Sequence, residues 1–198
     1  VRPKTEKAVK TFQAHSGLVV DGSVGGLTWA ALTTPATPGP PVAVSMPVAG
    51  LFTSQMGVDH IKSFETCSLT AYELGGVWHI GWGRSNSAGK EPRISKVLTI
   101  SQSEADAMFL DDLTDFEEAI KFHIKIDRMT QGQFDALVSI TFNKGPTWFG
   151  KSELRKAVND NAWAKVADLI LKEVPEPTHK FYRGLLRRRK AEVALLNG

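Results

Sequence analysis

Three residues with acid–base side chains lie close together in this sequence: Glu65, Glu73 and His79. Cleavage of a glycosidic bond usually needs one carboxylic acid to protonate the leaving oxygen, and a second group that handles water or the carbocation-like centre. Glu65 follows Phe64, and burial beside apolar groups favours the protonated form that such an acid needs. Glu73 and His79 are candidates for the second group. On spacing alone, all three can equally be ordinary surface residues.

Periodicity and turn residues predict the elements that position these side chains. Residues 56–66 form a helix, with apolar residues spaced by three. Residues 69–73 and 77–83 form a hairpin around a Leu-Gly-Gly turn. The first carboxylate then lies at a helix end and the other two groups on the hairpin, so the three can converge on one groove. Strand alternation places His79 on the same face as Gly81, which leaves room there for a bulky ligand.

The remainder of the chain is predicted to be mostly helical. Capping boxes at Ser101 and Thr130 open two helices that end near residues 124 and 145. Three further helices are predicted over 151–159, 162–172 and 178–197. The fold class is therefore α+β, a mostly helical domain with a small β-hairpin or sheet lobe, preceded by a small helical module.

A proline-rich tract divides the chain. Residues 33–47 contain five prolines, which favour an extended, semi-rigid spacer. We assign residues 1–33 to a small module, 34–47 to the linker and 48–198 to the larger domain. The module carries a helix near residues 5–14 and a shorter one that Thr28 can cap. So few residues cannot build a stable core alone.

Composition excludes several classes of protein. The chain has 198 residues, a net charge of +3 and one cysteine, Cys67, which we expect to be buried as a small hydrophobe. A single cysteine rules out an internal disulfide framework, and no metal-ligand spacing is present, so we expect neither a metal nor a cofactor. No apolar run reaches the roughly 20 residues that span a bilayer, and no signal-peptide pattern opens the given sequence. We expect a monomer without stable membrane insertion.

Charge is segregated along the sequence. Residues 101–118 carry seven acidic residues and no basic one, whereas residues 178–190 carry six Lys or Arg and no acidic residue. One interpretation is that two helix faces pair with each other. The other is a basic patch that attracts an anionic envelope polymer or nucleic acid. No aromatic platform or motif supports nucleic-acid binding.

The first segment resembles the second half of the peptidoglycan-binding domain found beside many cell-wall hydrolases. The matching residues are Lys4-Thr5, Ala8-Val9, Phe12-Gln13, Gly17-Leu18, Asp21-Gly22, Gly25, Thr28-Trp29 and Leu32. The resemblance implies bacterial peptidoglycan as a partner. The alternative is a helical cap without a ligand.

The larger domain resembles the phage-type lysozymes of glycoside hydrolase family 24, especially endolysins. The matching segments are Ile61-Lys62-x-Phe64-Glu65-x-Cys67, Leu69–Tyr72, Gly76-Val77-Trp78-x-Ile80-Gly81-x-Gly83, Thr99–Ala105, Gln133–Ser139, Phe142-Asn143-x-Gly145 and Gly184-Leu185-x-x-Arg188-Arg189-x-Ala191-Glu192. The resemblance implies a lysozyme-like fold and cleavage between N-acetylmuramic acid and N-acetylglucosamine. It also implies an enzyme that stays in the host cytoplasm until lysis and then acts on the cell wall in the periplasm or envelope.

The resemblance implies Glu65 as the acid, but the following residues depart from the family pattern. The family has Glu, eight residues, Asp or Cys, five residues and Thr. Here the first gap is seven residues, so either Glu73 or Leu74 takes the second place, and His79 stands in the third. His79 can act as a base, or attack the sugar carbon directly. In addition, Arg84 replaces the usual histidine.

Three residues are candidates for substrate binding. Asn143 matches a cleft-lining amide of the family and can bind acetamido groups, or simply cap a helix end. Arg183, with Arg187, can line the far side of the cleft. Tyr72 is either a sugar platform or a core residue.

Two other functions remain open at this point. One is a wall-binding protein whose enzymatic site has decayed, which the shortened loop suggests. The other is a cationic antibacterial protein that disrupts membranes through its Arg-rich final helix.

Overall fold

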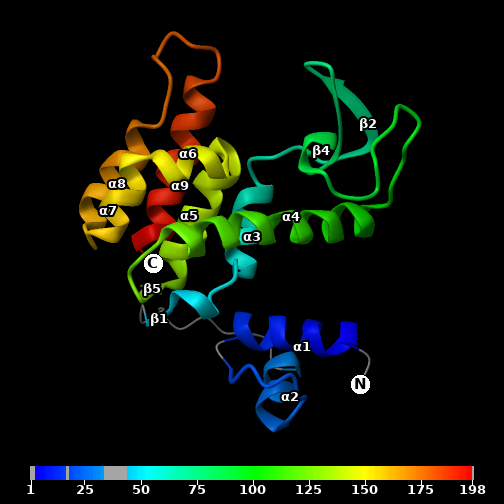
Figure 1. The fold of residues 1–198 in the computed structure, drawn as a ribbon, viewed down its shortest axis with the longest axis vertical. Helices are drawn as coiled ribbons and strands as arrows, with labels where there is room; N and C mark the ends of the chain where they lie inside the picture. The colour runs from blue at the N-terminus through cyan, green and yellow to red at the C-terminus, as the bar shows by residue number, and fades with distance from the viewer. Residues whose placement is uncertain (1–2, 17, 34–43, 198) are drawn as a thin grey trace.

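The computed structural model describes residues 3–16, 18–33 and 44–197 (Figure 1). Its helices are α1 (Pro3–His15), α2 (Gly26–Thr33), α3 (Gln55–Lys62), α4 (Gln102–His123), α5 (Gln131–Lys144), α6 (Pro146–Lys151), α7 (Glu153–Asn159), α8 (Trp163–Lys172) and α9 (Tyr182–Asn197). Its strands are β1 (Ser45–Pro47), β2 (Ser68–Leu74), β3 (Val77–Gly81), β4 (Arg84–Ser85) and β5 (Arg128–Thr130). Two short 3₁₀ helices cover Val48–Gly50 and Asn86–Ala88. The predicted α+β class, mostly helical with a small sheet lobe, is confirmed.

The long helix α4 connects two lobes. The antiparallel sheet β2-β3-β4 lies near its N-terminal end, and helices α5–α9 gather around its C-terminal end (Figure 1). A second, two-stranded sheet pairs β1 with β5. Residues 45–47, assigned to the linker from the sequence, form β1 and pair with Arg128–Thr130 of the larger domain. Most of the predicted linker, 34–43, lies outside the described residues.

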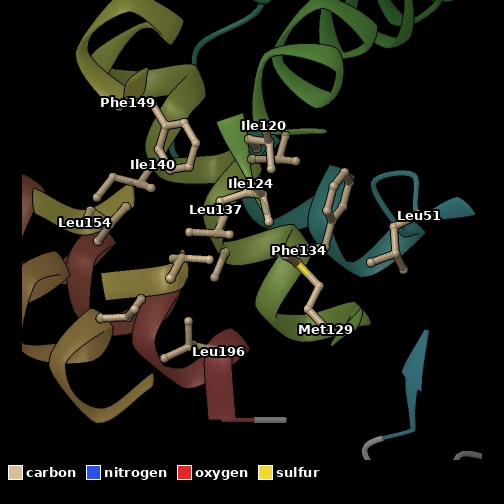
Figure 2. Packing of buried hydrophobic residues seen from close by; sticks show 14 of the residues in the cluster. Leu51, Ile120, Ile124, Met129, Phe134, Leu137, Ile140, Phe149, Leu154 and Leu196 are labelled. Atoms are coloured by element: carbon tan, nitrogen blue, oxygen red, sulfur yellow. The ribbon is translucent and has the colours of Figure 1, made fainter. Parts of the chain in front are cut away.

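The main core is built around α5. Phe134, Leu137 and Ile140 project from this helix and are fully buried, and they pack with Ile120 of α4 and Phe149 of α6 (Figure 2). Burial of each such side chain contributes about 1.5–3 kcal/mol. This packing holds the helical lobe rigid behind the segments that form the site.

A smaller core supports the sheet. Ile80 of β3, Ile94 and Met108 of α4 form it, with Trp78 packed against them. Since α4 contributes side chains to both cores, it fixes the sheet lobe relative to the helices.

The two predicted capping boxes are confirmed. The Glu104 amide donates to Ser101 Oγ at 3.2 Å, and the Gln133 amide donates to Thr130 Oγ1 at 3.1 Å. The helix α6 was not predicted, because the Gly145-Pro146 pair indicates a stop. Gly145, with φ of +92°, does end α5, but proline at the first position of a helix is favourable, so Pro146 opens the next one.

The N-terminal module is held together by a buried amide. The Gln13 side chain donates to Asp21 Oδ1, to the Ser23 carbonyl and to Thr28 Oγ1, at 2.7–3.1 Å. Thr28 was predicted to cap the second helix, but it lies inside α2 and bonds to Gln13. Trp29 on the same helix is 62% exposed. Polar contacts dominate this module, as expected for so short a segment.

Across the described residues, no helix has both the length and the hydrophobicity needed to cross a bilayer.

Candidate active site

A cleft of about 690 Å3 runs between the two lobes. The sheet lobe contributes Trp82, Gly83 and Arg84 to its lining, and the end of α5 contributes Asn143 and the segment that follows it. Glu65 also lines this cleft. Its carboxylate is therefore open to a ligand held between the lobes.

Glu65 lies in the turn that follows α3. The helix ends at Lys62, earlier than the predicted residue 66, and the turn continues through a bond from the Glu65 amide to the Lys62 carbonyl at 3.2 Å. The side chain is 25% exposed, and its Oε1 accepts a hydrogen bond from Arg188 Nη1 at 2.6 Å. A tight turn and a charge-assisted bond thus fix the carboxylate in place.

Arg188 was not among the predicted site residues. It lies on α9 with only 4% of its side chain exposed, whereas the predicted Arg183 and its neighbour Arg187 are exposed. The guanidinium groups of Arg187 and Arg188 both lie over the Phe64 ring, 5.2 and 5.6 Å from its centroid. The sequence carries a signal for Arg188: an arginine four residues before a glutamate on a predicted helix pairs with it on one face.

Tyr72 and His79 form one unit on the hairpin. They lie directly opposite each other on β2 and β3, and their rings stack with centroids 5.4 Å apart. Burial, and then the nearby charge of Glu65, raise the pKa of the Tyr72 hydroxyl. Neither Tyr72 nor His79 is among the residues that line the cleft. Tyr72 is 38% exposed and lies outside both core clusters, so the structure does not place it in the core.

The imidazole of His79 has a defined orientation. Its Nδ1 lies 2.9 Å from the carbonyl oxygen of Val77, and since a carbonyl only accepts, Nδ1 carries the hydrogen. In the neutral ring Nε2 then keeps its lone pair. The ring is half-buried, between the extremes of a core residue and a free surface residue.

Glu73 lies on the other face of the hairpin. It is opposite Trp78, one position from the Tyr72–His79 pair, and neighbouring positions of a strand point to opposite faces. Trp78 packs on the small core beneath the sheet, and Glu73 is exposed at the hairpin end. The structure therefore places Glu73 on the face opposite to the Tyr72–His79 pair, and of the three predicted acid–base residues only Glu65 lines the cleft.

Of the two glycines predicted to leave room for a ligand, Gly81 and Gly83, only Gly81 does not act as predicted. Gly81 has φ of +63°, which interrupts strand alternation, and a Cβ there would meet Ala105 of α4 at 3.6 Å. That contact is an ordinary one, so α4 fills the space beside Gly81 and leaves no room for a ligand, and the positive φ is the reason that glycine is favoured there. At Gly83, with φ of +107°, a Cβ would meet nothing within 4 Å, and this residue lines the cleft.

Asn143 lies on the cleft side of α5. Its Oδ1 accepts a hydrogen bond from Arg189 Nη2, which leaves the amide hydrogens available to donate toward the cleft. The alternative role, a helix cap, is taken by Gly145, whose amide bonds to the Thr141 carbonyl. Arg183 lies in the first turn of α9, outside the cleft lining.

The acidic and basic segments do not pair with each other. The acidic residues of α4 pair with cations of other segments: Asp106 with Lys62, and Asp111 and Asp112 with Arg84. On α9, Arg188 and Arg189 point inward. The outer cations of α9 form no ion pair with any described residue; they are Arg183, Arg187 and Lys190. Lys180, which precedes the helix, forms none with these residues either. The interpretation of two mutually paired helix faces is therefore wrong.

The described part of the chain holds no cluster of His, Cys, Asp or Glu that could bind a metal ion. Cys67 is half-buried and near Gln102, 3.8 Å from its amide nitrogen, rather than within either core.

A helical lobe and a small sheet lobe lie on either side of a cleft, and Glu65 follows α3, the first helix of the larger domain. These features define a lysozyme-like domain. Residues 62–192 match the phage lysozyme family, so this chain belongs to that family. Residues 1–32 match the putative peptidoglycan binding domain.

The chain is similar to several phage endolysins. It is 35% identical to the endolysin of Bacillus phage PZA over 150 residues, which cover 73% of this chain and 54% of that protein. It is 33% identical to the endolysin of Acyrthosiphon pisum secondary endosymbiont phage 1, covering 72% of this chain and 95% of that protein. The chain spans about half the length of the two Bacillus phage endolysins that it matches.

Solved structures show the same fold. The muramidase domain of SpmX from Asticaccaulis excentricus matches with a TM-score of 0.65 and 31% identity, over 74% of this chain and 98% of that domain. A P22 lysozyme variant matches with a TM-score of 0.64 and 28% identity, over 75% of this chain and 99% of that protein.

Proposed function

We propose that this protein is a peptidoglycan hydrolase that cleaves the bond between N-acetylmuramic acid and N-acetylglucosamine. The observation that carries the proposal is the Glu65 carboxylate, which lines the cleft and is held at 2.6 Å by the buried Arg188. Membership of the phage lysozyme family and similarity to endolysins and a muramidase domain support it.

In the proposed reaction, Glu65 donates a proton to the leaving glycosidic oxygen. The opposite face of the sugar then needs water and a base, and His79 can supply the base through Nε2, because Nδ1 is bound to the Val77 carbonyl. Stacking against Tyr72 holds the imidazole in this orientation. Glu65 thus acts as the acid and His79 as the base in this proposal.

His79 and Glu73 can be separated by experiment. We expect His79→Ala to lower the lytic rate about 10²-fold or more, the usual range for a positioned general base, and Glu73→Gln to change it less than about threefold. NMR of the first product reports the anomer: inversion supports a base, and retention supports direct attack by His79. Full activity in His79→Ala, or loss in Glu73→Gln alone, would reverse the assignment.

Substrate binding is proposed to involve two kinds of group. The free amide hydrogens of Asn143 donate to acetamido oxygens in the cleft. The cations of α9 that pair with no described residue, including Arg183, attract the carboxylates of peptide stems or anionic envelope polymers. We expect Arg183→Gln to raise KM at low salt and to match the unchanged protein at high salt, where screening removes the attraction. An equal KM at low salt would exclude this role.

The central experiment measures turbidity loss of permeabilised bacteria and the digest of purified peptidoglycan. We expect reducing-end muramic acid from the unchanged protein and no product from Glu65→Gln. Glu153→Gln, an exposed glutamate of α7, is the matched control and should keep full activity. Anhydro ends would indicate a lytic transglycosylase, and free peptides would overturn the assignment. Killing that persists in Glu65→Gln would indicate membrane disruption instead.

The remaining proposals concern context. We propose that the N-terminal module binds peptidoglycan, supported by its match over residues 1–32, and that the enzyme works as a monomer. We also propose that it waits in the host cytoplasm until lysis, as an endolysin acting from inside the cell must.

A further inference from the structure

A buried glutamate, Glu192 of α9, lies behind the two arginines that bind Glu65 and Asn143 of the cleft. Its side chain is fully buried, and its Oε1 accepts hydrogen bonds from Ser139 Oγ at 2.8 Å and from Arg188 Nε at 3.3 Å. Its Oε2 lies 2.9 Å from Arg189 Nη1. One carboxylate therefore lies in ion-pair contact with both guanidinium groups, through a hydrogen bond with Arg188 and through charge alone with Arg189.

The two arginines lead from Glu192 to different groups of the cleft. Arg188 donates to Glu65 Oε1 at 2.6 Å, and Arg189 donates to Asn143 Oδ1. The spacing on α9 allows this, because residues three and four positions before Glu192 lie on its own helix face. Glu192 is thus one side chain away from both the proposed acid and the proposed acetamido-binding amide.

We propose that Glu192 is a positioning residue for the glycosidase reaction: it fixes Arg188 against Glu65 and Arg189 against Asn143. The inference rests on the proposed function. If the charge of Glu192 is removed, Glu65 is the one carboxylate among the described residues that stays in ion-pair contact with these two cations. Arg188 then favours the anionic form of the acid more strongly, and the acid loses its catalytic proton at lower pH.

The other charged groups nearby do not replace Glu192. Burial, and then the charges of Arg188 and Arg189, lower the pKa of His60 on α3 to about 4, so His60 is neutral between pH 5 and 8. Glu173, after α8, is paired with Lys144 at 2.8 Å. Tyr72 of β2 has a raised pKa and carries no charge in this range.

The test compares Glu192→Gln with Leu196→Ala. Leu196 is a buried apolar residue one turn further along α9, so its truncation lowers stability without changing charge. With activity divided by the folded fraction, we expect Glu192→Gln to lower kcat about tenfold and raise KM about threefold, because both groups lose their support. The alkaline limb of its pH–activity profile should move about one unit toward acid. Leu196→Ala should move none of these.

If Glu192→Gln does not fold, Ser139→Ala provides the test, because it removes a hydrogen bond that favours the anionic form of Glu192 and so weakens the negative charge that Arg188 meets there. We then expect a kcat loss of about threefold and an acid shift in the same direction. The inference is overturned if the pH–activity profile does not shift and the changes in kcat and KM equal those of Leu196→Ala. An inactive unchanged protein, or an active Glu65→Gln, would instead overturn the proposed function.

Discussion

The most direct prediction concerns Arg188, which is buried between Glu65 and Glu192. Replacing it by Gln removes the bonds to Glu65 at 2.6 Å, to Glu192 at 3.3 Å and to the Ser139 carbonyl at 3.3 Å. Breaking a buried ion pair costs about 3–5 kcal/mol. We expect the lower end, about 3 kcal/mol, because Glu192 keeps Arg189 at 2.9 Å and the quarter-exposed Glu65 can be hydrated.

This loss of stability is large enough to measure by thermal unfolding. For a domain of this size, 1 kcal/mol shifts Tm by about 2–4 °C, so Arg188→Gln should unfold about 6–12 °C earlier. Lytic activity of the folded fraction should fall about 10²-fold, since Glu65 is no longer held. Arg187→Gln is the matched control: its side chain is exposed without an ion pair to any described residue, so its Tm should change by less than about 2 °C. Equal Tm changes in the two variants would refute the reasoning.

Two further predictions concern pH and packing. The pKa of His60 is about 4 in the folded protein against an ordinary value of 6.5, so the unfolded chain binds a proton first and the free energy of unfolding falls as pH drops from about 6.5 to about 4. His60→Gln should remove this part of the pH dependence in urea unfolding measured across that range. An unchanged pH dependence of the free energy of unfolding would contradict the prediction. Gly57→Ala should destabilise by about 1–3 kcal/mol, because a Cβ there would lie 2.7 Å from Asp135 Cγ. Gly50→Ala, where a Cβ meets nothing within 4 Å, is its control and should leave Tm nearly unchanged.

Local sequence signals predicted most elements of the fold. The two capping boxes and the Gly-Gly hairpin turn act through neighbouring residues, so their sequence was sufficient to place α4, α5 and the β2–β3 hairpin. The signals failed where a distant segment decides. Residues 45–47 form a strand only because β5, some eighty residues later in the chain, pairs with them.

The site was predicted less completely than the fold. Glu65 follows from the Phe-Glu context of the family and from its place at a helix end. The grouping of Glu73 with His79 came from their spacing, but the pairing register between the strands decides which face each side chain occupies. That register depends on how the hairpin packs on α4, and spacing does not contain it.

By itself, the sequence determined the family and the α+β class and singled out Glu65 as the candidate acid, because these depend on residue types and short-range order. Only the tertiary structure decided how the charges meet. Arg187, Arg188 and Arg189 are consecutive in the sequence and of one residue type, yet Arg188 and Arg189 point inward and contact Glu65, Glu192 and Asn143. The outer cations of α9 form no ion pair with any described residue. The physical reason is that the packing of α9 against α5 buries one face of the helix, and a buried arginine must find an anion or an acceptor there.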